Sequence, residues 1–167
     1  MANIHDHIIR DGDQHFMIDP ATRVITNTTA NKTSLMQYDH NSERFSFEIP
    51  KIVEGHDMSI SDSVQIHYLN TGDNRTDKKY GIYEVASDDI TTITGTKGDG
   101  SDDKLVFSWL ISDQATQYSG TLSFAILFAC KNQNGDITYR WSTAIHNAIV
   151  INPSMDNGEV IIEDYVD

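Results

Sequence analysis

Short runs of alternating apolar and polar residues, separated by Gly, Asn, Asp or Pro, recur along the chain and constrain its fold more than any other feature. Residues 45–49 and 64–68 are the clearest examples. A period of two places the apolar side chains on one face of a β-strand and the polar ones on the other. Helical periodicity is nearly absent. The sequence therefore predicts an all-β protein, an antiparallel β-sandwich of immunoglobulin-like or jelly-roll-like type, with a barrel as the second choice.

Turn residues predict two hairpins. Asp19-Pro20 predicts the turn of an N-terminal hairpin, since proline fixes the φ angle of a turn position. Asn134-Gly135 predicts a second hairpin after residues 121–130. Because 121–130 is the most apolar run, we expect it to be a central strand with both faces covered. The remaining strands are expected at 15–18, 23–27, 80–85, 90–93, 104–110, 137–141 and 144–151.

The length of 167 residues suits one domain with a full core. We divide the chain into a flexible N-terminal arm (1–14), a β-sandwich domain that includes the N-terminal hairpin (15–152), and an acidic C-terminal tail (153–167). One short helical turn is expected over 113–120, because Ser112 can cap its start and Gly120 can end it.

The formal net charge is −13, and the 12 Lys and Arg residues are scattered. No basic stripe is available to neutralise phosphates, so nucleic acid and anionic membranes are poor partners. No apolar run approaches the length that spans a bilayer, and the first residues lack the pattern of a signal peptide. We therefore expect a soluble protein made in a cytoplasm.

Residues 42–70 concentrate charged and imidazole side chains among strand-like residues, which could form a metal or acid–base cluster or the wet face of a sheet. The period-two pattern points Glu48 and His67 away from the core and places His56 and Asp57 in a connection. We interpret them as solvent-side and loop positions. The residues that we expect to contact a partner are His56, Asp57, His67, Tyr118 and Tyr165.

The chain contains none of the common catalytic or cofactor motifs: HExxH, CxxC, GxSxG, GxxxxGK[ST] and GxGxxG are all absent. We therefore assign no catalytic, cofactor or metal residues and expect a protein that is not an enzyme. The acidic loop 98–103 is expected to be a solvated hairpin loop rather than a calcium site, and Cys130 is expected to be a buried, inert thiol.

Two alternatives stay open at this point. A small metal-dependent hydrolase would need His56 and Asp57 to converge with His67 or His146 at metal-ligand distances of about 2 Å. A carbohydrate-binding module would need an exposed aromatic row on one sheet face, since aromatic rings stack on sugars. The candidates for that row are Trp109, Trp141, Tyr118 and Tyr139.

Three stretches of the chain form a familiar combination: YDHNSERFSFEIPKIVEGHDMSISDSVQIHYLN, KLVFSWLISDQATQYSGTLSFAILFAC and YRWSTAIHNAIVI. Together they resemble the N-terminal domains of tailed-phage upper baseplate proteins, and the resemblance covers residues 38–151. It implies a β-sandwich module that attaches a receptor-binding or fibre protein to the tail tip and is used in several copies per virion. It carries over no catalytic residues.

On this basis we expect a non-enzymatic virion structural protein, a baseplate or tail adaptor made in the host bacterial cytoplasm. Its expected partners are other phage tail or head structural proteins and further copies of itself, with a host glycan as an additional possibility. A capsid decoration or head-fibre protein is the neighbouring alternative. The segments 5–14 and 158–167 would then act as coupling arms.

Overall fold

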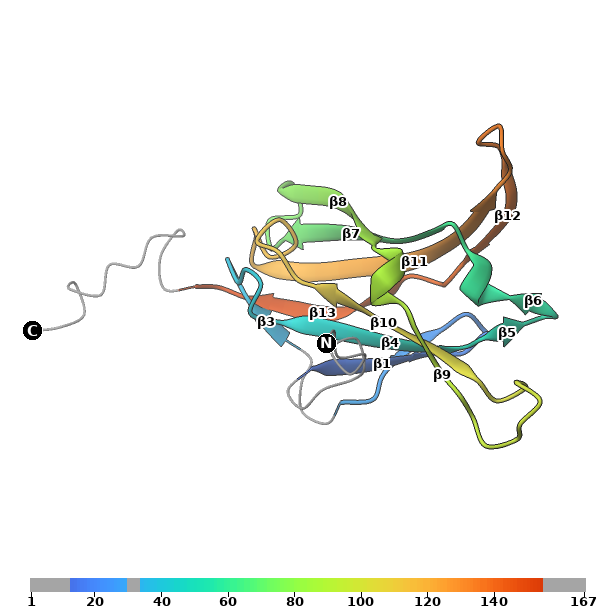
Figure 1. Ribbon diagram of the computed structural model, residues 1–167. Helices are drawn as coiled ribbons and strands as arrows, with labels where there is room; N and C mark the ends of the chain where they lie inside the picture. Colours follow the sequence, from blue (N-terminus) through green and yellow to red (C-terminus); the bar gives the residue numbers. More distant parts are fainter. Residues whose placement is uncertain (1–12, 30–33, 155–167) are drawn as a thin grey trace, which may run out of the picture.

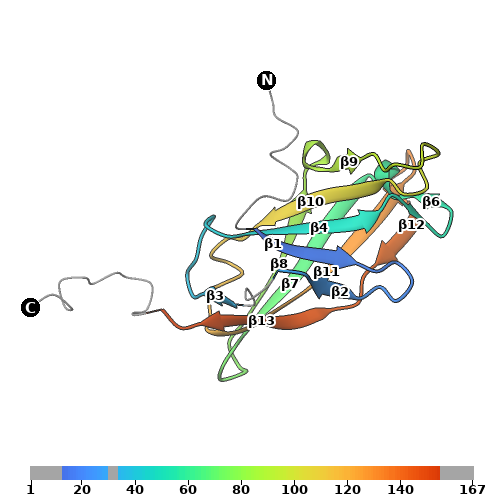
Figure 2. The same ribbon diagram turned by 90° about the horizontal axis from the view of Figure 1, so that it is seen from below.

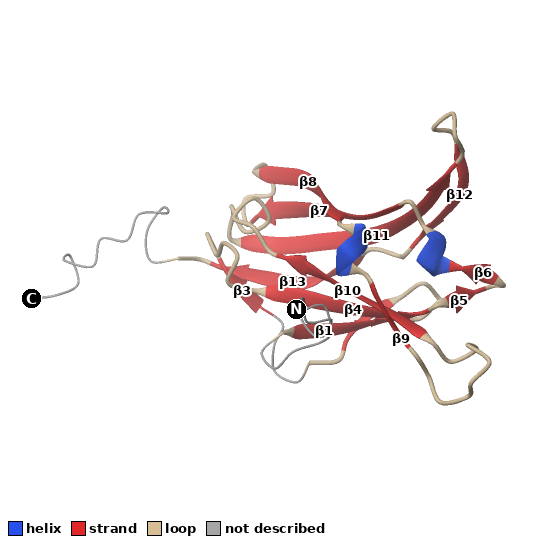
Figure 3. Cartoon of the chain, viewed as in Figure 1, coloured by secondary structure: helices blue, strands red, loops and turns tan. Residues whose placement is uncertain are grey.

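In the computed structural model, residues 13–29 and 34–154 are described. They form two β-sheets that face each other, so the all-β sandwich predicted from the alternating runs is confirmed (Figures 1 and 3). Within these ranges, the helical content consists of two short 3-10 helices, η2 (Met58–Ile60) and η3 (Ser87–Asp89). No helix in the described ranges has the length and apolar character needed to cross a membrane.

Sheet A has the strand order β2-β1-β4-β10-β9 (Figure 2). Its strands are β1 (Gln14–Ile18), β2 (Ile25–Asn27), β4 (Arg44–Pro50), β9 (Thr91–Ile93) and β10 (Lys104–Leu110). β1 and β2 pair in the antiparallel register of the predicted hairpin, with Met17 opposite Thr26. β1 also pairs with β4, but in parallel. The sandwich is therefore not purely antiparallel.

Sheet B has the order β3-β13-β11-β7-β8, and β12 pairs with β11 beyond β13. Its strands are β3 (Ser34–Met36), β7 (Ser63–Gly72), β8 (Lys78–Val85), β11 (Gly120–Lys131), β12 (Ile137–Ser142) and β13 (His146–Asn152). The Asn-Gly hairpin between β11 and β12 is as predicted, and Gly135 adopts the positive φ that its turn requires. A separate hairpin joins β5 (Ile52–Val53) to β6 (His56–Asp57).

The core between the sheets is a layer of aromatic rings. Phe124 of β11 lies at its centre, with ring centroids 5.7 Å from Phe16, 5.7 Å from Phe47 and 5.5 Å from Trp109. Each of these residues lies at a buried position of its strand, and of the four the period-two pattern had identified Phe47. Aromatic pairs in such tilted and edge-to-face arrangements add to the free energy of area burial.

The prediction of a helical turn over 113–120 is wrong. The segment is an irregular turn in which Ala115 N–H donates to the Ser112 carbonyl. Asn70, fully buried on β7, takes over the backbone farther along: its Oδ1 accepts from Tyr118 N–H at 2.7 Å and its Nδ2 donates to the Tyr118 carbonyl at 3.0 Å. Bonds to a side chain distant in sequence thus replace those a helix would make internally.

The expectation that residues 121–130 have both faces covered is also wrong. β11 is central in sheet B, but its side chains alternate between the core and a partly exposed outer face. Leu122, Phe124 and Ile126 point inward and are buried, whereas Ala125 and Leu127 are only half-buried. No element of the described chain packs over these outward residues, which leaves an apolar surface open.

Candidate functional site

The structure separates the histidines that the hydrolase alternative needs together. His56 lies in the β5–β6 hairpin, His67 on the outer face of sheet B, and His146 points into the core against Phe16 and Phe124. Among the described residues, no group of three or more His, Cys, Asp or Glu side chains is arranged to hold a metal ion. The convergence which that alternative requires is not found in the described part of the chain.

His56 and Asp57 both have local structural roles. The His56 ring stacks on Tyr139 with centroids 3.6 Å apart, and its Nε2 lies 3.8 Å from the Cys130 thiol. Asp57 caps η2 by accepting from Ser59 N–H at 2.9 Å. The hydroxyl and backbone of Ser59, together with nearby Lys51, lower the pKa of Asp57 despite some burial. Cys130 is half-buried rather than fully buried.

The carboxylates of the acidic loop 98–103 accept hydrogen bonds from nearby backbone N–H groups. Asp102 accepts from Thr96 N–H at 2.8 Å, and Asp103 accepts from Gly95 N–H at 2.8 Å. A Cβ at Gly95 would collide with the Asp102 carboxylate, so this close approach requires glycine. The hydrogen bonds that Asp102 accepts, from the Thr96 N–H first and then from the Lys97 N–H, lower the pKa of its carboxyl.

The aromatic residues proposed for a sugar platform do not form an exposed row. Trp109 is 1% exposed and stacks on Tyr68, and Trp141 is 2% exposed beneath the Arg23 guanidinium. Tyr139 lies under the His56 ring. The exposed aromatic row required by the carbohydrate-binding alternative is therefore not built from these tryptophans.

Tyr118 is half-buried at a polar hollow beside the β7–β8 turn, and its hydroxyl accepts from Gln117 Nε2 at 3.2 Å. Tyr165 lies outside the described residues. Of the residues expected to contact a partner, His67 is the one that the structure places at the centre of an open apolar surface.

We call this surface the concave face: the outer side of sheet B over β7, β8, β11 and β12, where the sheet curls upward toward β12 (Figure 1). It contains two adjoining hollows of ≈ 230 and ≈ 220 Å³, which share His67, Ala125 and Ile145. The other outward side chains that line them are Leu69, Tyr80, Ser123, Leu127, Arg140 and Ser142.

Hydrogen bonds hold the centre of the concave face rigid. Both ring nitrogens of His67 are engaged: Nδ1 lies 2.6 Å from the Tyr80 hydroxyl and Nε2 lies 3.0 Å from Gln65 Oε1. Because Gln65 Oε1 can only accept, Nε2 donates, and a neutral ring then accepts from Tyr80 at Nδ1. Tyr80 is thereby fixed on the surface, although it is 58% exposed.

Ile145 is positioned over the hollows by a loop anchored to β11. Thr143 N–H donates to the Ile126 carbonyl at 2.9 Å, and Ile126 N–H donates to the Thr143 hydroxyl at 2.9 Å. The next residue, Ala144, bonds to the Arg23 carbonyl. The anchored loop carries the Ile145 side chain, which is 71% exposed, at the rim of both hollows.

Sequence reasoning identified His67 but missed Tyr80, Ile82 and Ile145. A signal for the first two was present: in the run KKYGIYEV, apolar residues fall on both strand faces, which indicates a strand with an apolar outer side. Between them, Gly81 leaves room for the Tyr68 hydroxyl, with which a Cβ at this position would collide. Ile145 is an isolated apolar residue in a loop, and no sequence pattern marks it.

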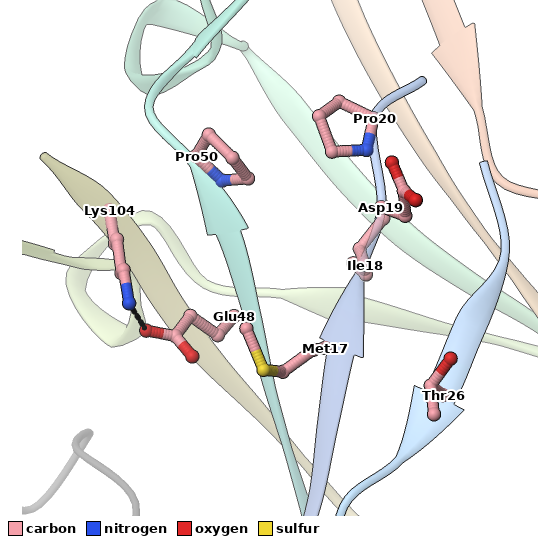
Figure 4. Close-up of a pocket in the computed structure, with 8 residues that line it drawn as sticks. All are labelled: Met17, Ile18, Asp19, Pro20, Thr26, Glu48, Pro50 and Lys104. Atoms are coloured by element: carbon pink, nitrogen blue, oxygen red, sulfur yellow. Dashed lines mark ion pairs between the residues drawn. The ribbon is translucent and has the colours of Figure 1, made fainter. Parts of the chain in front are cut away.

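A different hollow, of ≈ 320 Å³, lies on the outer side of sheet A (Figure 4). Met17, Pro20 and Pro50 give it an apolar part, and an ion pair between Lys104 and Glu48 at 2.9 Å forms one side. Two of its charged groups, Lys104 and Glu48, are thus already paired with each other.

No protein-family model matches the chain, and no curated protein matches its sequence. Among solved structures, the N-terminal domain of phage TP901-1 ORF48 matches with a TM-score of 0.44 and 14% sequence identity, over 84% of this chain and 98% of that one. At this TM-score the likeness establishes neither fold nor function for the present chain.

Proposed function

We propose that the chain is a non-enzymatic structural module of a phage virion, a baseplate or tail adaptor that holds a neighbouring virion protein on the concave face. The chain would be made in the cytoplasm of the host bacterium and act in the assembled particle. The resemblance of residues 38–151 to upper baseplate domains supports this role. The structural observation that carries it is the concave face itself.

Exposed apolar side chains gather on the concave face of a chain whose net charge is −13. Ile145 is 71% exposed, Tyr80 58% and Ile82 49%. Contiguous apolar surface rimmed by polar groups is typical of sites where another protein binds. The hydrogen-bonded His67 centre and the anchored Ile145 loop keep this surface in one conformation, which lowers the entropy lost on binding.

The test is incorporation of the chain into phage particles. Gold-labelled antibody against the chain should mark the tail of particles assembled with the wild-type protein. Ile145→Lys places a charge over both hollows and should remove the label, while leaving the thermal unfolding of the purified chain unchanged. Ile137→Lys is the matched control, because Ile137 is 55% exposed on β12 but lines neither hollow.

Absence of the wild-type chain from particles contradicts the proposal, as does full incorporation of the Ile145→Lys variant. Label on the head instead of the tail would favour the capsid decoration or head-fibre alternative.

A further inference from the structure

β8 is a long sheet edge that is free of partners among the described residues. Its eight residues pair with β7 in an unbroken register, from Val64 opposite Val85 to Thr71 opposite Lys78. No backbone group of Lys78–Val85 has a further hydrogen bond within the described chain. One side of this strand therefore presents a row of unpaired N–H and C=O groups.

β8 differs from the other edges of the two sheets. Edge strands β2, β3 and β9 have three residues each, and β12 has six residues beside a register shift at Cys130. Proteins commonly protect edges by keeping them short, by interrupting them with proline or a bulge, or by placing charged residues, especially lysine, along them. β8 is long and contains no proline or bulge, its two lysines stand only at its first two positions, and it exposes Tyr80 and Ile82 on its outer side. It has the features of an edge that accepts a further strand.

The charges on β8 indicate the chemistry of that strand. Lys78 and Lys79 stand at its start, and neither ammonium group has an ion-pair partner among the described residues. An acidic, extended segment rich in β-branched residues would satisfy both the backbone edge and these cations.

The C-terminal sequence EVIIEDYVD, residues 159–167, has this composition. It has four β-branched residues and Tyr165, four carboxylates, and no Lys, Arg, Pro or Gly. Its nine residues match the eight-residue length of β8. In a chain of net charge −13, Lys78-Lys79 is the one place where two basic residues are consecutive in the sequence.

The strand directions favour a segment from another copy. β13 is antiparallel to β11, β11 to β7, and β7 to β8, so the chain leaves β13 beyond the end of the sheet where β8 begins. To lie antiparallel to its own β8, the tail would first have to run back along that strand, about 27 Å for eight residues. A second copy supplies an antiparallel strand without this detour.

We propose that residues 159–167 of one copy add as a strand to the free edge of β8 in a second copy, with their carboxylates beside Lys78 and Lys79. The inference concerns self-association and is independent of which virion protein occupies the concave face. Reciprocal exchange of the two tails would close a symmetric dimer.

The test measures the mass of the full-length chain in solution by light scattering over a range of concentrations. The wild type should form a multimer. K78E/K79E and E163K/D164K should each raise the dissociation constant by roughly tenfold or more through like-charge repulsion. The four substitutions combined should restore association, because the charges are then exchanged. K97E/K131E is the control for added negative charge, since both lysines are exposed and remote from β8 in sequence.

Hydrogen exchange gives a second readout: those amides of 78–85 that do not bond to β7 should be protected in the multimer and exposed after dissociation. A peptide of residues 155–167 should protect the same amides, and a scrambled peptide should not. A wild type that is monomeric at every concentration overturns the inference. A multimer whose dissociation constant is unchanged by K78E/K79E overturns it as well. So does a multimer that E163K/D164K does not weaken and whose association the combined variant does not restore. Gold labelling of particles is unaffected by these outcomes, so failure of the inference is distinguishable from failure of the proposed function.

Discussion

The outer faces of the two sheets differ in how their side chains are partnered. On sheet A, the Ser46 hydroxyl donates to Asp13 at 2.8 Å, and Glu48 pairs with Lys104 at 2.9 Å. On sheet B, Leu127 and Ile145 line open hollows and have no polar group to pair. These polar groups of sheet A are satisfied within the described chain, whereas no described element covers the apolar side chains of sheet B. Under the proposed function, the outer face of sheet A serves stability and the concave face serves binding.

The largest expected effect comes from a comparison of a core residue with a residue on the concave face of the same strand. Phe124→Ala should lower the free energy of unfolding by about 3–5 kcal/mol, because it removes the ring at the centre of the aromatic layer. Leu127→Ala, three residues along the same strand but on the concave face, should cost about 1 kcal/mol or less. Urea unfolding of both variants measures this contrast. Equal losses would mean that the concave face is part of the stabilising core.

A matched pair of serines compares the two outer faces directly. Ser46→Ala on β4 leaves the buried Asp13 carboxylate without one donor and should cost about 1–3 kcal/mol. Ser123→Ala on β11 lies on the concave face and should change stability by about 0.5 kcal/mol or less. Thermal unfolding of both variants measures the two losses of stability. A larger loss for Ser123→Ala than for Ser46→Ala would contradict the difference between the two outer faces.

The alternating pattern predicted the strands well because it depends on neighbours along the chain. Phe45 and Ile66 alternate with polar residues, and both are fully buried in the structure. The same rule pointed His67 outward, as the structure has it. The turn over 113–120 was mispredicted because Asn70 binds its backbone from a distant strand. A bond between groups 48 residues apart leaves no local signal.

The candidate site was predicted only in part for a similar reason. The concave face arises where β8, β11 and the loop carrying Ile145 come together, and these segments are far apart in sequence. The pattern of one strand can say that a side chain points outward, but not whether another element covers it. The error about the outer face of β11 has this origin.

His146 makes the stability of the core depend on pH. Burial lowers its pKa from the ordinary 6.5, while the bond of its Nδ1 to the Ile25 carbonyl opposes this shift only in part. The unfolded chain therefore binds this proton more readily than the folded one. Stability should be unaffected by this group above pH 6.5 and should fall as the pH decreases from 6.5 through the folded pKa.

Replacing the histidine should remove that part of the pH dependence. His146→Gln keeps a donor for the Ile25 carbonyl and should flatten the decline in unfolding temperature below pH 6.5. His40→Gln, at an exposed position, should leave the decline in place. An identical acid profile for the wild type and His146→Gln would show that other groups cause it.

The smallest expected effect comes from the ion pair on the outer face of sheet A. Glu48→Gln should lower stability by about 0.2–1 kcal/mol at low salt, because ion pairs that water can reach at the protein surface gain little. The loss should disappear at about 1 M salt, where charges are screened within roughly 3 Å. Glu84→Gln on β8 is the control: Glu84 accepts from Ser63 at 2.9 Å and has no cationic partner among the described residues, so glutamine can replace it at any salt concentration. A salt-dependent loss at Glu84 instead would mean that sheet B also carries an internal charge pair, and the two outer faces would then differ only in their apolar residues.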